Sequence, residues 1–348
     1  MNINMVNKPV FSIIMAAYNA EKFIDEAISS IIKQTFTDWQ LIVVDDGSAD
    51  STPSILQRYA ASDERISIIN QTNSGSAGAA RNSALKFVQG KYCQMLDSDD
   101  IISENFLELH YDLLVKDNPD IIIPNLIFFE NGIKNEIRKW IGLNGKHEVI
   151  NGEAGFFLSL DWTIHGFFTV RTEILKEVKY ENDLINGDEF TTRKLLYNSK
   201  KIMFSDSFYY YRLNTSSTTR DEKNQVKMYQ CLLTDYNLLE YSIYNNMSIE
   251  IKKACAKKLL NAIKYYYKSY NDEHKKWSRE DSIYVHNILS SVYSKINIMK
   301  MLKLIPVFSL FLCLTGKKYV FFEFYMFLKA QLIRYQRLLN IKKAVTGS

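Results

Sequence analysis

Cysteine is scarce in this sequence, and the few cysteines show neither pairing nor the spacing of a metal site. The four lie far apart, at Cys93, Cys231, Cys255 and Cys313. A disulfide framework or a zinc site needs cysteines at short, regular spacing, whereas scattered thiols are typical of buried cysteines in a reducing compartment. The sequence therefore predicts no structural disulfide and no zinc site.

The N-terminal segment lacks the apolar core of a secretion signal. Residues 1–9 are polar, so we expect the chain to stay in the cytoplasm. The stretch 305–314 is apolar, but Pro306 interrupts it and it is too short to cross a bilayer. The net charge is only +4, which by itself gives no reason to expect nucleic acid as a partner.

Two common nucleotide-binding fingerprints are absent as well. The small-residue loop at 73–78 matches neither the G-x-G-x-x-G pattern of dinucleotide-binding folds nor the G-x-x-x-x-G-K-[ST] phosphate loop. Dinucleotide oxidoreductases and P-loop NTPases therefore lose their main support. A nucleotide site in this chain needs a different fold.

The first third of the chain does contain a regular alternation of strand and helix. Apolar runs typical of buried parallel strands lie at 11–16, 41–44, 66–69 and 92–96, and helical segments separate them. This pattern predicts an α/β fold with a mostly parallel sheet covered by helices. Such sheets bind ligands beyond the carboxyl ends of their strands, where this chain has polar residues at 18–19, 45–46 and 97–99.

The fourth strand ends abruptly in an acidic cluster. Asp97, Asp99 and Asp100 place three carboxylates within four residues, and without a cation they would repel one another. Magnesium or manganese takes oxygen ligands, usually one or two carboxylates together with substrate phosphates. The pattern therefore predicts that Asp97 and Asp99 supply the protein half of a metal–diphosphate site, with Mg²⁺ or Mn²⁺ as cofactor. The alternative is a polar turn in which Asp100 caps the next helix.

Taken together, these elements resemble the N-terminal region of family 2 glycosyltransferases, which have the Rossmann-like GT-A fold. The similarity covers about the first hundred residues, and a weaker match continues through 187–189 to 209–212. Ala16 departs from the family pattern, which usually has proline there, and this alters the rigidity of the turn more than its chemistry. The matching segments are 12–19, 34–36, 44–48, 73–75 with 80–82, and 96–100.

The resemblance implies a UDP-sugar donor and roles in binding it. Tyr18 would border or stack on the uracil, and Asp46 would hydrogen-bond the base or ribose; the alternatives are a core tyrosine and a turn aspartate. Arg81, expected near the start of its helix, would lie beside the base or diphosphate. Asp97 would contact ribose or metal, and Asp99 would ligate the metal directly. The implied nucleotide-binding set is Ala16, Tyr18, Asp46, Arg81, Asp97 and Ser98.

The acceptor side of the site is expected in the middle of the chain. The family has Glu-Asp at its catalytic position, with the Asp as base, and the local register places Gly187 and Asp188 there. A shift of one residue would promote Glu189 instead, and a helix N-cap is the structural alternative for Asp188. Two further candidates for acceptor or phosphate contacts are Arg212 and His165, the latter with a packed histidine as the alternative.

The activity implied by the resemblance is inverting, metal-dependent transfer of a hexose or N-acetylhexosamine to a hydroxyl of a saccharide. Family members point towards bacterial O-antigen or capsule synthesis on a polyprenyl-diphosphate-linked acceptor. The residues leave the identity of the sugar open. The alternative from another class is a non-catalytic sugar-nucleotide-binding or scaffold protein of the same fold.

We expect a catalytic domain at 1–220, with a nucleotide-sugar half at 1–100 and an acceptor half at 101–220, and a helical region at 221–348. From Lys295 onward the chain has ten Lys or Arg residues against one acidic residue, Glu323, among many Phe, Leu and Ile residues. This composition favours helices lying in an anionic membrane interface, so we expect peripheral binding to the inner face of the cytoplasmic membrane. A helical pair packed on the catalytic domain is the alternative.

Aromatic residues and lysines also interleave before that basic stretch. Tyrosines fill 265–267 and Trp277 follows, with lysines between and around them. This pattern fits a nucleic-acid surface. The glycosyltransferase resemblance does not call for one, and we expect no nucleic-acid partner.

Overall fold

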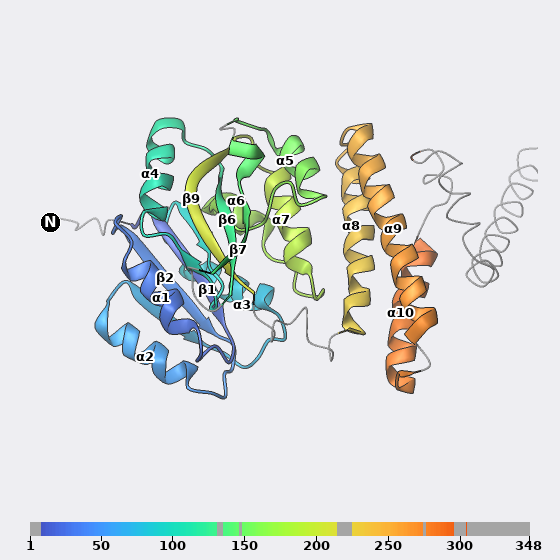
Figure 1. The fold of residues 1–348 in the computed structure, drawn as a ribbon, viewed down its shortest axis with the longest axis horizontal. Helices are drawn as coiled ribbons and strands as arrows, with labels where there is room; N and C mark the ends of the chain where they lie inside the picture. Colours follow the sequence, from blue (N-terminus) through green and yellow to red (C-terminus); the bar gives the residue numbers. More distant parts are fainter. Residues whose placement is uncertain are drawn as a thin grey trace, which may run out of the picture. The chain divides into compact units, whose positions relative to one another are not determined.

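The computed structural model describes residues 8–130, 135–145, 148–213, 225–273 and 276–295, together with Leu304. The chain divides into two compact units, Met1–Leu238 and Leu239–Ser348, so the division falls later than the expected boundary at residue 220. Figure 1 shows the first unit as a sheet with helices packed on it and the second as helical.

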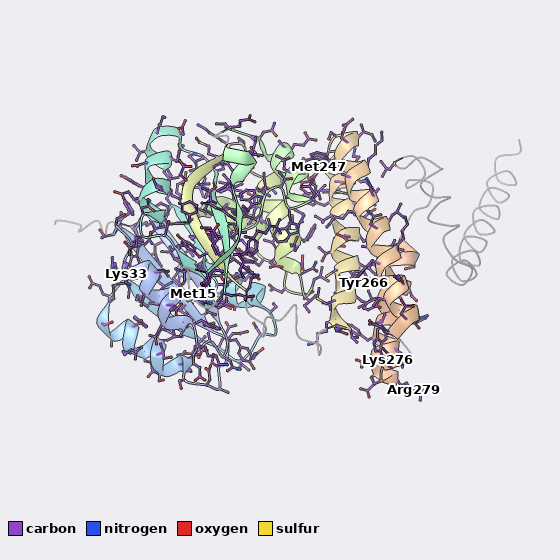
Figure 2. All side chains as sticks on the ribbon, in the orientation of Figure 1. Met15, Lys33, Met247, Tyr266, Lys276 and Arg279 are labelled. Atoms are coloured by element: carbon purple, nitrogen blue, oxygen red, sulfur yellow. The ribbon has the colours of Figure 1, made fainter. Side chains whose placement is uncertain are left out.

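The first part of the chain alternates between strand and helix, as predicted. The first strand is buried on both faces: Ile13 and Met15 belong to one core cluster, and Ile14 between them belongs to another. Met15 is fully buried, whereas Lys33 is exposed (Figure 2). The elements are β1 (Phe11–Ala17), α1 (Ile24–Ile32), β2 (Trp39–Asp45), α2 (Thr52–Ser62), β3 (Ile66–Asn70), α3 (Ala77–Ala84) and β4 (Tyr92–Met95).

The remainder of the first unit adds five strands, of which three gave no sequence signal. β5 and β8 have only two and three residues, too few to show a period, and β7 is an almost fully exposed strand. The elements are β5 (Ile101–Ile102), α4 (Phe106–Asp117), β6 (Ile121–Phe129), β7 (Glu136–Trp140), α5 (Gly152–Ser159), β8 (Thr169–Arg171), α6 (Thr172–Val178), α7 (Gly187–Tyr197) and β9 (Ile202–Arg212).

The nine strands of the described residues belong to one sheet, in the order β3-β2-β1-β4-β8-β6-β9-β5, with β7 pairing β6 off this path. β1, β2, β3, β4, β6 and β9 run in one direction, and β5, β7 and β8 run in the opposite one. The sheet is therefore mostly parallel, as predicted. The carboxyl ends of β1, β2 and β4 lie at one edge, where ligands bind in such sheets.

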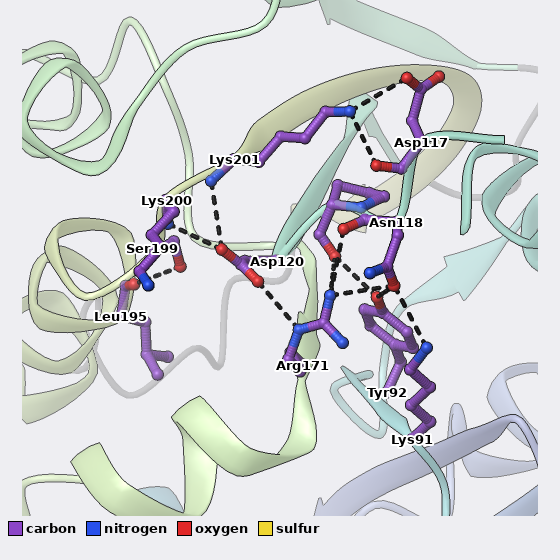
Figure 3. A network of polar contacts seen from close by, with 11 residues as sticks. Lys91, Tyr92, Asp117, Asn118, Asp120, Arg171, Leu195, Ser199, Lys200 and Lys201 are labelled. Atoms are coloured by element: carbon purple, nitrogen blue, oxygen red, sulfur yellow. Dashed lines mark hydrogen bonds and ion pairs between the residues drawn. The ribbon is translucent and has the colours of Figure 1, made fainter. Parts of the chain in front are cut away.

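A polar network closes the opposite edge of the sheet. Asp120, just before β6, accepts hydrogen bonds from Arg171 Nε at 2.9 Å and from the backbone nitrogens of Lys200 at 2.8 Å and Lys201 at 3.2 Å (Figure 3). Burial would raise the pKa of Asp120, but these hydrogen bonds outweigh burial and lower it. The network joins the ends of β6, β8 and β9, which makes it a structural feature of the sheet.

Helices make up the described part of the second unit. α8 (Cys231–Tyr244) leads into this unit, and α9 (Ile249–Glu273) and α10 (Arg279–Lys295) follow, which confirms the predicted helical character. Within the residues described here, no helix is long and apolar enough to cross a membrane. The membrane-interface prediction concerns the chain from Lys295 onward, of which only Lys295 and Leu304 belong to the described residues.

Candidate active site

The carboxyl ends of β1 and β2 are joined by hydrogen bonds. The backbone nitrogen of Asp46 donates to Ala17 O at 2.9 Å, and Asn19, in the left-handed region at φ 50°, accepts from the backbone nitrogen of Ala49 at 2.9 Å. Tyr18 is 54% exposed at this edge, so the alternative of a core tyrosine is wrong. Ala16 pairs with Val44 inside the sheet.

Asp46 is buried and organises the loop that follows β3. Its carboxylate accepts hydrogen bonds from Gln71 Nε2 at 2.6 Å, Ser74 N at 2.9 Å and Ser74 Oγ at 3.0 Å. The turn-holding alternative therefore describes its present contacts. Binding a base or ribose through Asp46 remains a prediction, and this position at the sheet edge is compatible with it.

The acidic turn after β4 contains two accessible carboxylates and one buried carboxylate. Asp97 and Asp99 are partly exposed, as is Ser98, whereas Asp100 is 1% exposed. Asp100 caps no helix, because β5 follows it and α4 begins only at Phe106. Burial raises the pKa of Asp100 well above its ordinary value, and the nearby carboxylates of Asp99 and Asp97 raise it further.

Arg81 lies in the last turn of α3, not near its start as expected from the sequence. Its Nη2 atom donates to Asp97 Oδ1 at 2.5 Å, and its guanidinium lies over the ring of Tyr180, 5.3 Å from the ring centre. Burial would lower the pKa of Arg81, but Asp97, Tyr180 and Asp188 outweigh burial and raise it. The cation is thus surrounded by groups that favour its charge.

Asp188 stands in the first turn of α7, within electrostatic reach of Arg81. The N-cap of α7 is Asn186, so the N-cap alternative for Asp188 is wrong. As a residue, Asp188 is exposed to solvent. The protein packed around its carboxylate nevertheless desolvates that group, and this desolvation raises the pKa of Asp188. Arg81 opposes that shift, and Glu189 and Asp97 add to it. A carboxylate with raised pKa beside a cation is suited to accept a proton.

Glu189 makes different contacts from its neighbour. It forms an ion pair within α7 with Arg193, which is 2% exposed. Arg193 also donates from Nη1 to the backbone oxygen of Glu189 at 2.7 Å and from Nη2 to Ser159 O at 2.9 Å. The structure therefore brings Asp188, rather than Glu189, into the group that contains Arg81 and Asp97.

The segment at 180–181 brings α3 and α7 together, and the sequence did not single it out. Asn82 donates from Nδ2 to Tyr180 O at 2.9 Å and accepts from Tyr180 N at 2.8 Å. Gly187 packs against this segment, since a Cβ there would lie 2.4 Å from Glu181 O. This contact gives a physical reason for glycine where the family has glutamate. The only sequence signal was Asn82 itself, next to the arginine of the matched motif.

His165 and Arg212 are both buried and already engaged. His165 accepts from Phe167 N at 3.2 Å through Nδ1 and bonds Pro124 O at 2.9 Å through Nε2; burial lowers its pKa to about 4, although the Pro124 contact opposes this. Arg212 donates to Asp99 O at 2.7 Å and to Glu26 Oε2 at 2.5 Å. His165 thus matches the packed alternative, and phosphate binding by Arg212 stays a prediction.

The carboxylates of the turn fit one kind of metal site. Among the described residues, no group of three or more His, Cys, Asp or Glu side chains is arranged to hold a metal ion. A hard cation that completes its shell with substrate phosphates and water needs only one or two carboxylates. Asp97 and Asp99 fit such an ion. They do not fit a metal site whose ligands all come from the protein.

Comparison with known proteins identifies this domain. Residues 12–179 match the model of glycosyl transferase family 2. Residues 12–179 therefore form a glycosyl transferase family 2 domain. Glycosyltransferase GlyG from Streptococcus pneumoniae serotype 4 is 29% identical over 222 residues, which are 61% of this chain and 74% of GlyG. The segments matched above belong to this family 2 domain, and its GT-A architecture carries the site.

Two further similarities extend the comparison. WfgD from Escherichia coli, named UDP-Glc:alpha-D-GlcNAc-diphosphoundecaprenol beta-1,3-glucosyltransferase, is 40% identical over 120 residues, which are 34% of this chain and only 47% of WfgD. The structure of S. aureus TarS 1-349 in complex with UDP-GlcNAc has a TM-score of 0.63 and 22% identity, and the match covers 85% of this chain and 83% of TarS 1-349. The likeness to TarS is one of fold.

Proposed function

We propose that this family 2 glycosyltransferase moves a sugar from a UDP-sugar to a hydroxyl group of a saccharide acceptor, with inversion. One observation carries the proposal: Arg81 binds Asp97 of the donor-side turn, and Asp188 of the acceptor-side helix lies within its electrostatic reach. A single cation thus joins a predicted donor-binding carboxylate to a predicted base. The UDP-GlcNAc complex of TarS and the UDP-Glc in the name of WfgD support a UDP-sugar donor.

In the proposed reaction Asp188 takes the proton of the acceptor hydroxyl as that oxygen attacks the anomeric carbon opposite the leaving UDP. The raised pKa of Asp188 makes it a stronger base than an ordinary aspartate. Asp99 and Asp97 would hold Mg²⁺ or Mn²⁺, which supplies positive charge to the diphosphate. Arg81 keeps Asp97 in place while its own charge favours the ionised form of Asp188.

The competing proposal is a scaffold that binds a sugar nucleotide without turnover. Release of UDP upon addition of an acceptor separates the two, because a scaffold leaves the nucleotide sugar intact. We expect UDP release to depend on both donor and acceptor. A donor screen over UDP-linked glucose, galactose and their N-acetylated forms would identify the sugar, and no release with any donor and acceptor pair would favour the scaffold.

Uridine should be preferred over guanosine as the nucleotide. We expect UDP with manganese to raise the melting temperature, since a ligand that binds the folded state stabilises it by about 2.7 kcal/mol at one hundred times its dissociation constant. Thermal unfolding with UDP, GDP or neither, each with and without manganese, measures this preference. Stabilisation by GDP but not by UDP would contradict the uridine assignment.

For the acceptor we infer a polyprenyl-diphosphate-linked saccharide in bacterial surface-polysaccharide synthesis, reached from the inner face of the cytoplasmic membrane. The diphosphoundecaprenol in the name of WfgD supports such an acceptor. Lys253, Lys257, Lys264 and Lys268 are exposed at helical spacing along α9, and each cation near an anionic surface contributes about 1 kcal/mol. An enzyme on the membrane surface gains effective concentration for a lipid-linked acceptor.

Removal of residues 300–348 should weaken membrane binding and spare chemistry. The removed segment holds most of the basic and apolar residues of the tail, the chain from Lys295 onward. Flotation with anionic liposomes should therefore fall, and membrane binding of the full chain should weaken as salt is added. Transfer to a short soluble acceptor should persist. Flotation that is unchanged by the truncation would mean that the tail does not dock the enzyme, and neutral liposomes serve as the control surface.

A further inference from the structure

Two residues of β9 hold the acidic turn through four hydrogen bonds. The hydroxyl of Tyr209 donates to Asp100 Oδ2 at 2.8 Å and accepts from Asp97 N at 3.3 Å. Arg212 donates from its backbone nitrogen to Asp100 Oδ1 at 2.8 Å and from Nε to Asp99 O at 2.7 Å. Every aspartate of the turn is therefore fixed by its backbone or its side chain.

The buried carboxylate at the centre of these bonds is costly for the fold. Asp100 is buried beside Asp97 and Asp99, and both burial and like charges oppose its ionised form. Yet Tyr209 and the Arg212 backbone both donate to it, so Asp100 acts as a double acceptor. Groups of this kind orient a turn more sharply than apolar packing does, because hydrogen bonds fix direction as well as distance.

The ring of Tyr209 is itself held in place. It stacks on Phe167 with ring centres 4.6 Å apart and an angle of 27° between the planes. The backbone nitrogen of Phe167 donates to His165 Nδ1 at 3.2 Å, and His165 Nε2 bonds Pro124 O at 2.9 Å. Stacking on Phe167 therefore holds the Tyr209 ring so that its hydroxyl reaches the turn. His165 contributes indirectly, because it holds the backbone of Phe167.

We propose that Tyr209 and Asp100 are positioning residues for the donor. They set the backbone of the turn so that Asp97 and Asp99 face the diphosphate of the sugar nucleotide and its divalent cation. This inference rests on the proposed function. Outer groups that orient metal-binding carboxylates typically contribute 10- to 100-fold in metal affinity or activity.

The test compares Tyr209→Phe with Tyr210→Phe. Tyr209→Phe removes the hydroxyl and keeps the ring on Phe167, whereas Tyr210, the next residue of β9, points to the other face of the sheet. We expect Tyr209→Phe to raise the manganese concentration for half-maximal activity and the donor KM about 10- to 100-fold. The pH at which kcat/KM falls on the acidic side should stay the same, because that fall is assigned to Asp188, which this variant does not change. Tyr210→Phe should match the wild type.

Calorimetric titration of UDP with manganese provides a readout that needs no turnover. Weaker binding by Tyr209→Phe, and by Asp100→Asn as a second variant, supports the positioning role. A melting temperature lowered by either variant, with unchanged UDP affinity and donor KM, would overturn the positioning role. The hydrogen bonds between β9 and the acidic turn would then serve the fold alone. Wild-type protein that binds UDP without transfer would refute the proposed function and leave this binding test valid; wild-type protein that binds no UDP would refute both.

Discussion

Replacing Asp188 with asparagine should abolish transfer and make the protein more stable at neutral pH. The asparagine keeps the shape of the side chain and removes the base, and a positioned general base contributes about 10²- to 10⁴-fold to the rate. Stability should rise because the folded protein holds the Asp188 carboxylate in surroundings that raise its pKa. Loss of rate together with a gain in melting temperature is typical of a residue kept for function.

The sign of the stability effect follows from the direction of the pKa shift. An aspartate in the unfolded chain titrates near about 3.9, and below that pH the carboxyl is protonated in both states and contributes no penalty. As pH rises towards the higher folded-state pKa, the unfolded state ionises first and the folded protein loses stability. Once the pH exceeds the folded-state pKa the penalty is complete, and asparagine removes it. The difference in melting temperature should therefore shrink at acidic pH.

The same shift predicts the pH dependence of the wild-type reaction. The base must be ionised to accept a proton, so kcat/KM should fall as pH decreases through a pKa above the ordinary value for aspartate. Initial rates from acidic to neutral pH, with donor and acceptor varied in turn, measure this limb. An acid limb at or below the ordinary aspartate value would contradict the role given to Asp188.

Glu189→Gln is the matched control, since it alters the neighbouring acid on the same helix. Glu189 pairs with the buried guanidinium of Arg193, so its loss leaves a buried cation without its carboxylate and should lower the melting temperature. Its transfer rate should stay within about tenfold of the wild type, because Asp188 keeps its function as base. The opposite pattern, with Glu189→Gln inactive and Asp188→Asn active, would make Glu189 the base.

The sequence was most informative where strands are buried on both faces. The runs at 11–16, 41–44 and 92–96 correspond to β1, β2 and β4, where mostly apolar residues are required. The run at 66–69 corresponds to β3, in which Ile66 is buried and Ser67 is exposed. β8 could not be found in this way, since its three residues are too few for a period. Its place between β4 and β6 arises from antiparallel pairing with both, which no local pattern records.

For the candidate site, sequence reasoning found the chemical groups but not their partners. Asp97 and Asp188 were singled out by motif, yet the pairing of Arg81 with Asp97 and the presence of Tyr180 beside it depend on tertiary contacts. The expected position of Arg81 was wrong because α3 is only eight residues long. His165 drew attention as a lone histidine among aromatic residues, and only the structure shows that both ring nitrogens are already engaged.

Removal of divalent cations should abolish transfer, and Asp99→Asn should raise the amount of cation needed to restore it. Two accessible carboxylates at the end of β4 suit a cation that takes its other ligands from the donor diphosphate. Asparagine offers one neutral oxygen in place of the carboxylate, so we expect at least about a tenfold higher manganese concentration for half-maximal rate. Protein treated with EDTA and titrated with manganese or magnesium measures the effect.

Asp25→Asn provides the control for this titration, since Asp25 is an accessible carboxylate on α1 that pairs with Arg58 at the surface. Its removal should leave the cation requirement unchanged, because Asp25 pairs with Arg58 of α2 and a surface ion pair contributes about 0–1 kcal/mol. Full transfer by EDTA-treated wild-type protein, with no response to added manganese or magnesium, would contradict a metal-dependent reaction. Arg81 and Arg212, which both contact the turn, would then be candidates to stabilise the leaving diphosphate.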